Sequence, residues 1–171
     1  MSYTPEQLFS FLDSLGIEHQ TASHQPVFTV DEARAVQDQV SGAHSKNLFL
    51  KDAKGASWLV VMLADKRADL AGIARRVGAA KFSFAKPELL ADVLGLTPGS
   101  VTPFALVNDK EKRVTVVLDG DMLKNETIHF HPLHNAASTT IRAADLLKFV
   151  QALGYEPIVV ECGCQQAGNN V

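Results

Sequence analysis

Apolar residues recur along the chain at the spacing of amphipathic helices, and together with capping signals they predict five helices. These lie at residues 5–15, 29–37, 70–77, 87–94 and 143–153. Pro5 and Pro87 stand at first-turn positions, where a missing backbone N–H costs nothing. The segment at 29–37 is predicted from its capping box, which Thr29 opens. The other four end at a glycine, which is typical of a helix C-terminus.

Shorter apolar runs predict strands at residues 17–22, 48–50, 58–63, 104–107, 114–118, 127–130 and 158–160. The run at 58–63 is apolar throughout, which indicates a central strand covered on both faces. A polar turn ending in Gly55 joins it to 48–50, so we expect a hairpin. A second pair is expected around the polar residues 108–112. Hairpins mixed with helices predict a single α+β domain with a mixed, mostly antiparallel sheet surrounded by helices.

Length and composition limit the class of protein that this chain can be. The chain has 171 residues, of which 46% are hydrophobic and 20% charged, as in ordinary globular domains. The longest apolar run, 58–64, is too short for a membrane span, and the N-terminal residues do not resemble a secretory signal. We therefore expect a cytoplasmic protein. Residues 165–171 are polar and predict a flexible tail.

The formal net charge of −3 conceals a gradient along the sequence. Residues 46–86 contain nine basic and three acidic residues, a net charge of +6, which leaves −9 for the rest. A local basic face on an acidic body suits brief contact with a polyanion. Solvated helix faces would produce the same count, so charge alone leaves both interpretations open.

Two segments are candidates for binding chemistry. Lys46 and Asn47 lie at the start of an apolar strand, where a lysine must reach solvent, pair or bind an anion. The loop before Phe104 contains two prolines and Gly99, so its backbone N–H groups can approach a ligand closely. Such a loop can stabilise an oxyanion, or it can simply be a rigid connection.

Histidines form the third candidate. His129, His131 and His134, with Cys162 and Cys164, could bind zinc, although no further ligand has matching spacing. His131 precedes a proline and is better interpreted as a hydrogen-bonding group in a pocket wall. The sequence contains neither a nucleophile elbow nor a zinc-protease motif, so an enzyme of this sequence must work by positioning and polarisation.

Four motifs in this order resemble the YbaK-like aminoacyl-tRNA deacylase family, which also occurs as the insertion domain of bacterial prolyl-tRNA synthetases. They are HQPVFTVDEA at 24–33, KNLFLKD at 46–52, GSVTPFAL at 99–106 and HPLHN at 131–135. The resemblance spans residues 4 to 160 and is strongest to free-standing prolyl-tRNA editing proteins that remove alanine from tRNA(Pro).

The resemblance implies an editing domain over residues 1–164 with a small pocket, acting without cofactor or metal on the acceptor end of mischarged tRNA(Pro). Prolyl-tRNA synthetase is the implied candidate partner. Lys46 would hold a phosphate or the aminoacyl end, Asn47 would orient the substrate, and His131 would bind the α-amino group or a water. The loop would direct backbone N–H groups of Gly99 and Ser100 at the ester. The residues implied in substrate contact are Thr29, Val101, Thr102, Pro103 and Phe104.

Alternatives remain at this point. A protein of the same fold could edit Cys-tRNA(Pro) or Ser-tRNA(Ala), because pocket volume decides between amino acids and sequence does not measure it. A non-catalytic module that binds tRNA or a synthetase, and the zinc protein described above, are further possibilities.

Overall fold

The computed structural model describes residues 2–26 and 42–164. The predicted helix at 29–37, Thr29 and the predicted tail at 165–171 lie outside these residues. The described helices are α1 (Pro5–Ser14), α3 (Leu70–Val77), α4 (Pro87–Leu94) and α5 (Ala143–Ala152), with short 3-10 helices η1 (Pro103–Asn108) and η2 (Met122–Lys124). The strands are β1 (Gln20–Ser23), β2 (Ala43–Asp52), β3 (Ser57–Leu63), β4 (Arg67–Ala68), β5 (Phe82–Phe84), β6 (Val114–Asp119), β7 (Thr127–Phe130), β8 (Ala137–Arg142), β9 (Ile158–Val160) and β10 (Gly163–Cys164).

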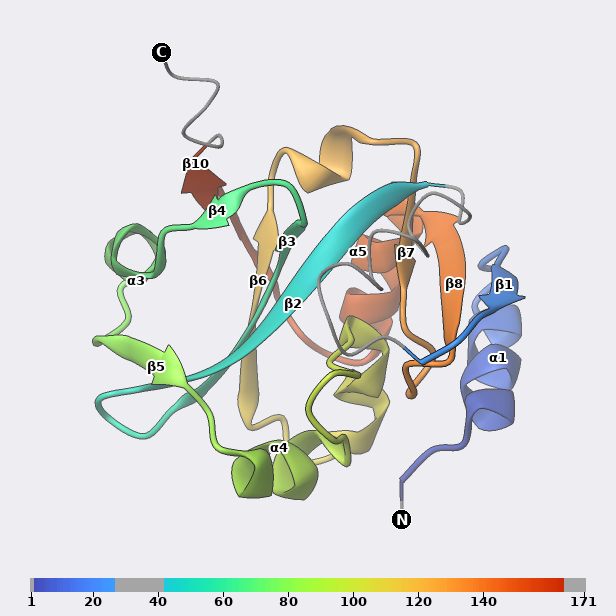
Figure 1. The fold of residues 1–171 in the computed structure, drawn as a ribbon, viewed down its shortest axis with the longest axis horizontal. Helices are drawn as coiled ribbons and strands as arrows, with labels where there is room; N and C mark the ends of the chain where they lie inside the picture. Colours follow the sequence, from blue (N-terminus) through green and yellow to red (C-terminus); the bar gives the residue numbers. More distant parts are fainter. Residues whose placement is uncertain (1, 27–41, 165–171) are drawn as a thin grey trace.

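The main sheet is mixed, with the order β1-β8-β7-β2-β3-β6-β9 and with β5 added along β2 (Figure 1). The pairs β1–β8, β7–β8, β2–β3 and β2–β5 are antiparallel, whereas β2–β7, β3–β6 and β6–β9 are parallel. Strands β4 and β10 form a separate pair. This confirms the predicted α+β class with a mixed sheet.

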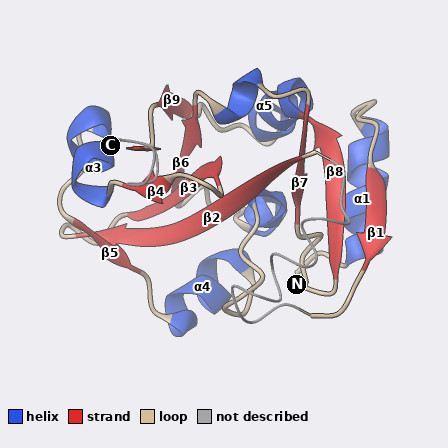
Figure 2. Cartoon of the chain, turned by 45° about the horizontal axis from the view of Figure 1, so that its top comes forward, coloured by secondary structure: helices blue, strands red, loops and turns tan. Residues whose placement is uncertain are grey.

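Strand β2 joins the two halves of this sheet. It pairs with β7 only at Ala43 and His44, and it then runs antiparallel to β3 from Ser45 to Lys51. Figure 2 shows β2 crossing the molecule diagonally between the two sets of strands. Beyond His44 the strands β2 and β7 diverge, so residues that follow this point on each strand belong to different halves of the sheet.

Two hydrophobic cores lie on opposite faces of β3. The larger core contains apolar residues of α1, α4, η1 and α5, and β3 contributes Leu59 and Val61 to it. The smaller core contains Val60 and Met62 of β3 together with Ile73 of α3. Residues 57–62 are all buried, which confirms the predicted central strand covered on both faces.

The helix boundaries follow the predicted local signals. Thr4 and Gln7 form a complete capping box at the start of α1, and Pro5 occupies its first turn. Helices α3 and α4 end at Gly78 and Gly95, whose φ angles of 74° and 67° lie in the left-handed region that favours glycine. None of the described helices combines the length and hydrophobicity needed to cross a bilayer.

The prediction of a strand at 104–107 was wrong. These residues belong to η1, which Thr102 caps by accepting a hydrogen bond from the Phe104 N–H and in which Pro103 holds the first turn. The apolar run therefore reflects complete burial in the larger core, and short apolar runs do not distinguish a buried turn of helix from a strand. Strands β5 and β8 were not predicted, because the serines and threonines of β8 weaken its apolar pattern.

Candidate active site

The loop between α4 and η1 is held by its own hydrogen bonds. The N–H of Ser100 donates to the Thr97 carbonyl (3.3 Å), and the Ser100 hydroxyl donates to the same oxygen (2.8 Å). Gly99 lies between them with φ at +92°, a conformation that residues with a side chain rarely adopt. The N–H groups of Gly99, Val101 and Thr102 have no hydrogen-bond partner among the described residues. Gly99 is exposed and Val101 half-buried, so their N–H groups are the donors that this loop can offer to a ligand.

The C-terminal end of the loop is fixed in the larger core. Thr102 is fully buried, and the fully buried ring of Phe104 makes edge contacts with Phe130 and Phe149 at centroid distances of 5.6 and 5.5 Å. Pro103 is buried as well. The side chains of Pro103 and Phe104, predicted to contact substrate, thus serve the core, and Val101 packs against it. Their contribution to a site is to hold the loop backbone in place.

The same loop lies against the segment that follows β7. A side-chain carbon added at Gly99 would lie 3.8 Å from the Asn135 amide nitrogen, and the contact between Phe104 and Phe130 joins η1 to the end of β7. His131 comes directly after Phe130. The structure therefore brings the predicted loop and the predicted HPLHN motif together, although 27 or more residues of sequence separate them.

His131 has a defined tautomer in this segment. Its Nδ1 lies 3.1 Å from the Ala137 carbonyl oxygen, and because a carbonyl can only accept, Nδ1 carries the proton. Burial lowers the pKa of His131. The charges of His24 and His134 lower this pKa further, whereas the hydrogen bond to Ala137 raises it in part. The ring is therefore neutral at pH 7, which leaves Nε2 as a hydrogen-bond acceptor.

Asn47 and Lys46 lie on opposite faces of the sheet. Asn47 is paired with Val61 of the larger core and Lys46 with Met62 of the smaller core, and residues paired directly across an antiparallel ladder share a face. Asn47 thus shares its face with the core that holds Phe104. The structure separates Lys46 from that face, because neighbouring strand residues alternate.

The Asn47 side chain contains a buried polar atom without a partner. Its Oδ1 is fully shielded and accepts no hydrogen bond, and it is the one such side-chain atom among the described residues. A buried acceptor left unpaired costs free energy, so native proteins rarely retain one unless a ligand or water pairs with it. Asn47 is therefore a strong candidate for a binding residue.

Lys46 is half-buried near the end of β3. Its Nζ donates to the Lys66 carbonyl oxygen. Burial lowers the pKa of Lys46, and the carboxylate of Asp65 opposes this effect in part. Lys66 itself points into a cluster of carboxylates, with its Nζ at 3.0 Å from Asp119, 2.8 Å from Asp121 and 3.2 Å from Glu161.

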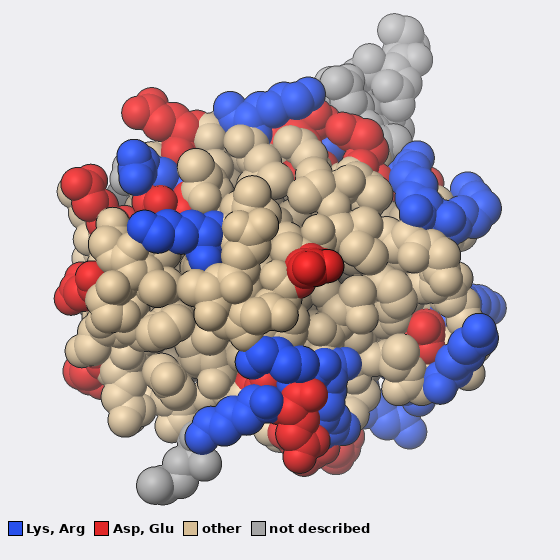
Figure 3. Space-filling view, turned by 180° about the vertical axis from the view of Figure 1, so that it is seen from behind, with Lys and Arg blue, Asp and Glu red and all other residues tan. Residues whose placement is uncertain are grey.

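The fold places the basic side chains of residues 46–86 in different surroundings, so their charges do not act together. Lys66 is neutralised by the three carboxylates around it, and Lys46 is half-buried. Figure 3 shows one face of the molecule, where basic and acidic side chains are mixed around a largely uncharged area with an acidic side chain near its middle. A uniform basic face therefore does not form there, and the exposed lysines act in local groups.

The described side chains of the zinc hypothesis, those of His129, His131, His134 and Cys162, do not assemble. Among the described residues, the group of three or more His, Cys, Asp or Glu side chains with ligand atoms in mutual reach consists of Asp119, Asp121 and Glu161. The histidines lie on or after β7, whereas Cys162 is buried after β9, with β2, β3 and β6 between them in the sheet. At about 4.8 Å per strand this separation is far beyond a shared metal.

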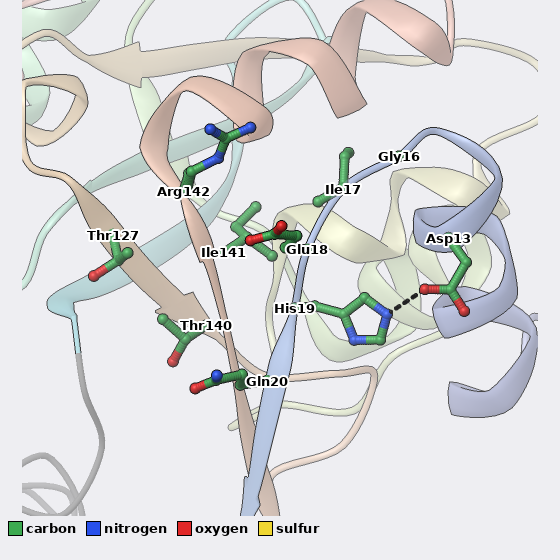
Figure 4. A pocket seen from close by; sticks show the side chains of 10 residues that line it. All are labelled: Asp13, Gly16, Ile17, Glu18, His19, Gln20, Thr127, Thr140, Ile141 and Arg142. Carbon is green, nitrogen blue, oxygen red and sulfur yellow. Dashed lines mark hydrogen bonds and ion pairs between the residues drawn. The ribbon is translucent and has the colours of Figure 1, made fainter.

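A cavity of about 730 Å³ opens at the other end of β7 and β8, and sequence reasoning missed it (Figure 4). His19 and Asp13 form a pair in it, with Nε2 and Oδ1 2.9 Å apart. Thr127, Thr140 and Arg142 line the opposite wall. None of the predicted site residues that the structure describes lines this cavity.

Sequence reasoning also missed two neighbours of His131. His24 lies with its ring centroid 6.4 Å from that of His131 and contacts the Ser138 hydroxyl through Nε2 (2.9 Å). Asn135 approaches Gly99. Both lie within the quoted motifs at 24–33 and 131–135, so the signal was present, but the contacts depend on the pairing of β8 with β1 and β7.

Taken together, the fold and the site define an α+β domain that can polarise a carbonyl group through loop N–H donors beside a neutral histidine. The hydroxyl of Ser100 donates to the Thr97 carbonyl, so its proton is already engaged within the loop. An arrangement of N–H donors beside a histidine suits an enzyme that positions a reactive bond for attack by water.

Comparison with known proteins agrees with this class. Residues 24–149 match the aminoacyl-tRNA editing domain family. The chain is 38% identical over 157 residues to prolyl-tRNA synthetase associated domain-containing protein 1 of Danio rerio, covering 91% of this chain and 85% of the relative. It is 37% identical over 144 residues to the prolyl-tRNA editing protein ProX of Acetoanaerobium sticklandii, covering 84% and 88%.

A solved structure of a candidate trans-editing enzyme for prolyl-tRNA synthetase has the same fold, with a TM-score of 0.70 and 22% identity over 96% of this chain and 99% of that one. The chain belongs to the aminoacyl-tRNA editing domain family. As a member it is an aminoacyl-tRNA hydrolase, which confirms the resemblance and the enzyme class expected from the motifs.

Proposed function

We propose that the protein hydrolyses the ester of mischarged tRNA(Pro), with Ala-tRNA(Pro) as its substrate. The observation that carries this proposal is the loop of Gly99 to Thr102, in which the N–H groups of Gly99 and Val101 have no partner among the described residues and Gly99 lies against Asn135 of the segment that begins at His131. The names of the relatives, a prolyl-tRNA editing protein and a prolyl-tRNA synthetase associated protein, support the choice of tRNA(Pro).

The chemistry suits a site without a nucleophile. An aminoacyl ester is activated by the neighbouring ribose hydroxyl and the α-ammonium group, so its hydrolysis needs orientation and oxyanion stabilisation. In the proposed mechanism, the N–H groups of the loop donate to the carbonyl oxygen as water attacks the carbon. The proton leaves the water with help from the ribose 2′-hydroxyl, and the 3′-oxygen departs with a proton.

His131 and Asn47 would recognise the aminoacyl group. Each offers an acceptor, Nε2 of the neutral imidazole and the unpaired Oδ1 of the amide. The α-ammonium of an amino acid supplies three donors and suits such acceptors. Both residues therefore have a proposed role in orientation, and neither has to form a covalent bond.

Lys46 has a different proposed role, because its ammonium lies on the other face of the sheet. We place it as an anchor for a phosphate of the acceptor end, reached when Nζ leaves the Lys66 carbonyl. Lys46→Ala should abolish deacylation at sub-saturating tRNA while the thermal unfolding midpoint stays within a few degrees of wild type. Wild-type kcat/KM for Lys46→Ala would contradict the role, and Lys46→Arg serves as the variant that keeps the charge.

Selectivity explains why such an enzyme is needed. A synthetase site shaped for proline rejects the smaller alanine weakly, because absent methylenes are worth only about 1–3 kcal/mol. A second, smaller pocket can exclude proline by size and hydrolyse what enters it.

The decisive experiment is a panel of mischarged tRNAs in which amino acid and tRNA vary separately. We expect rapid hydrolysis of Ala-tRNA(Pro) and none of Pro-tRNA(Pro), with and without prolyl-tRNA synthetase present. Faster hydrolysis of Cys-tRNA(Pro) or Ser-tRNA(Ala) would reassign the substrate. If the protein binds tRNA or the synthetase but hydrolyses none of the esters, it is a non-catalytic binding module and not an enzyme.

A further inference from the structure

An aromatic ring stands exposed among lysines on strand β5. Phe84 is 64% exposed, and Val159 on β9 is the other large hydrophobic side chain exposed among the described residues. Lys51 and Lys86 line the same hollow as the ring, Lys81 lines the neighbouring hollow, and all three are exposed. We refer to these three lysines with Phe84 as the β5 surface. An exposed phenyl ring is unfavourable in water and suggests a partner that covers it.

The fold presents this surface on both sides of β5. The strand pairs with β2 alone, with Phe84 opposite Leu50 and Ser83 opposite Lys51. Two hollows flank it, of about 400 and 490 Å³, and Lys51 and Ser83 line both. The surface is therefore a shallow, continuous feature, which suits a strand-like ligand more than a small molecule.

The nearby acidic residues do not cancel this charge. Asp92 lines one hollow and is paired with Arg113 at 2.9 Å. Asp52 lines the other and is buried, where it accepts hydrogen bonds from the N–H groups of Lys54 and Ala56 and from the Trp58 indole. Asp52 and Glu88 thus remain as two carboxylates against the three lysines, which leaves the surface with a net positive charge.

We propose that the β5 surface binds the RNA of the aminoacyl-tRNA, with an unpaired nucleotide stacked on Phe84 and the lysines on neighbouring phosphates. Aromatic rings interleaved with basic side chains are the usual means of holding single-stranded nucleic acid. This inference rests on the proposed function and adds a second contact with the substrate, outside the site that holds the amino acid.

The path of the chain supports one RNA reaching both places. From Phe84 the chain runs through Lys86 into α4, whose far end leads into the loop that contains Gly99. Eight helical residues span about 12 Å. At the axial rise of about 3.4 Å per nucleotide in a stacked strand, that is about three to four nucleotides, so one nucleic-acid segment can contact the β5 surface while its end enters the candidate active site.

The test is direct binding of an uncharged tRNA(Pro) transcript by fluorescence anisotropy across a salt series. Phe84→Ala should weaken binding about tenfold, which is about 1.4 kcal/mol, whereas Phe84→Trp should restore it because any base stacks on a larger ring. Val159→Ala is the matched control, since it removes an exposed apolar side chain at the far edge of the sheet. Phe84 is exposed, so thermal unfolding of its variants should match wild type.

The contribution of the lysines is tested by the salt dependence of tRNA binding. Replacing Lys51, Lys81 or Lys86 by Gln should each reduce the slope of log affinity against log salt by about 0.7 to 0.9, whereas Lys110→Gln, an exposed lysine elsewhere, should not. Unchanged slopes in all three variants would contradict the phosphate contacts.

The outcomes separate this inference from the proposed function. Wild-type tRNA binding by Phe84→Ala overturns the β5 surface even if Ala-tRNA(Pro) is hydrolysed normally. If Phe84→Ala loses tRNA binding but the wild-type protein hydrolyses no ester, the proposal that the β5 surface binds RNA stands. The proposed hydrolysis of mischarged tRNA(Pro) is then wrong. Normal tRNA binding with lost binding to prolyl-tRNA synthetase would assign the ring to a protein partner and overturn the RNA proposal.

Discussion

At the scale of single residues, Asn47 is the side chain whose environment is least explained by stability. Its buried Oδ1 has no partner, whereas the side chain of Asn108 is satisfied on both atoms, donating to the Leu94 carbonyl at 2.8 Å and accepting from the Tyr3 N–H at 2.8 Å. The side chain of Asn108 therefore contributes to stability, whereas that of Asn47 leaves a buried polar atom unpaired. The contrast suggests that Asn47 is kept for a ligand.

This contrast makes a prediction about stability and activity. Asn47→Leu removes an unpaired buried acceptor, so the free energy of unfolding should stay equal or rise by about 1 kcal/mol, while kcat/KM for deacylation falls. Asn108→Leu should do the opposite, with a loss of about 1–3 kcal/mol and near-normal activity per folded molecule. Urea unfolding and single-turnover hydrolysis measure the two quantities. An unstable but active Asn47→Leu would exclude the binding role.

His131 predicts a pH dependence. Its pKa is lowered below the usual 6.5, so the neutral ring with its Nε2 acceptor is present at neutral pH and is lost as the pH falls below 6.5 through the lowered pKa. The kcat/KM profile should be flat near pH 7 and then fall about tenfold per pH unit on the acid side. His131→Gln should lose that acid limb with a reduced plateau, whereas His19→Gln, a change at the cavity in Figure 4, should keep it.

At the scale of elements, the candidate active site depends on how η1 begins. Thr102 caps η1 through a 3.2 Å hydrogen bond from the Phe104 N–H, and the same residue ends the loop of Gly99. A defect in this cap therefore reaches both the core and the loop. The cap of α1 at Thr4, with a 3.2 Å bond from the Gln7 N–H, is a comparable device on another helix.

The two caps provide a matched pair of variants. Thr102→Ala and Thr4→Ala should each lower the free energy of unfolding by about 1 kcal/mol, because each removes one capping hydrogen bond. Only Thr102→Ala should also lower kcat, since it releases the loop N–H groups from their geometry. Equal kcat values in the two variants, measured at saturating tRNA, would show that the loop does not depend on η1.

At the scale of the whole molecule, Lys66 ties together segments that are far apart in sequence. It follows β3 and contacts Asp119 at the end of β6 and Glu161 after β9, with Asp121 as the third carboxylate. Asp119 is fully buried, and Lys66 is its partner in an ion pair. Removing one member of a buried pair leaves the other charged and desolvated, which is strongly destabilising.

Lys66→Met should therefore lower the free energy of unfolding by about 3–5 kcal/mol at pH 7. Lys124→Met removes an exposed partner of Asp121 and should cost less than about 1 kcal/mol. Bonding to Lys66 lowers the pKa of Asp121 from 3.8 to about 2, so this stabilisation is present above pH 4 and is lost as the pH falls toward 2. The difference between wild type and Lys66→Met should shrink in acid unfolding over that range.

Local signals in the sequence determined the boundaries of α1, α3, α4 and α5, because a cap, a proline or a glycine acts on the residues next to it. The same holds for the β2–β3 hairpin with its polar turn. The motifs also identified the family, and the Gly99 loop and the HPLHN segment as its candidate chemistry.

Tertiary structure decided what those segments meet. Neighbouring residues on a strand alternate in any case, and the register with β3 decided that Asn47 faces the larger core and Lys46 the smaller one. Burial against Phe130 and Phe149 turned 104–107 into helix, and the pairing of β5 with β2 left Phe84 exposed among lysines. These are non-local contacts between residues tens of positions apart, and a local pattern contains no information about which of its neighbours in space will cover it.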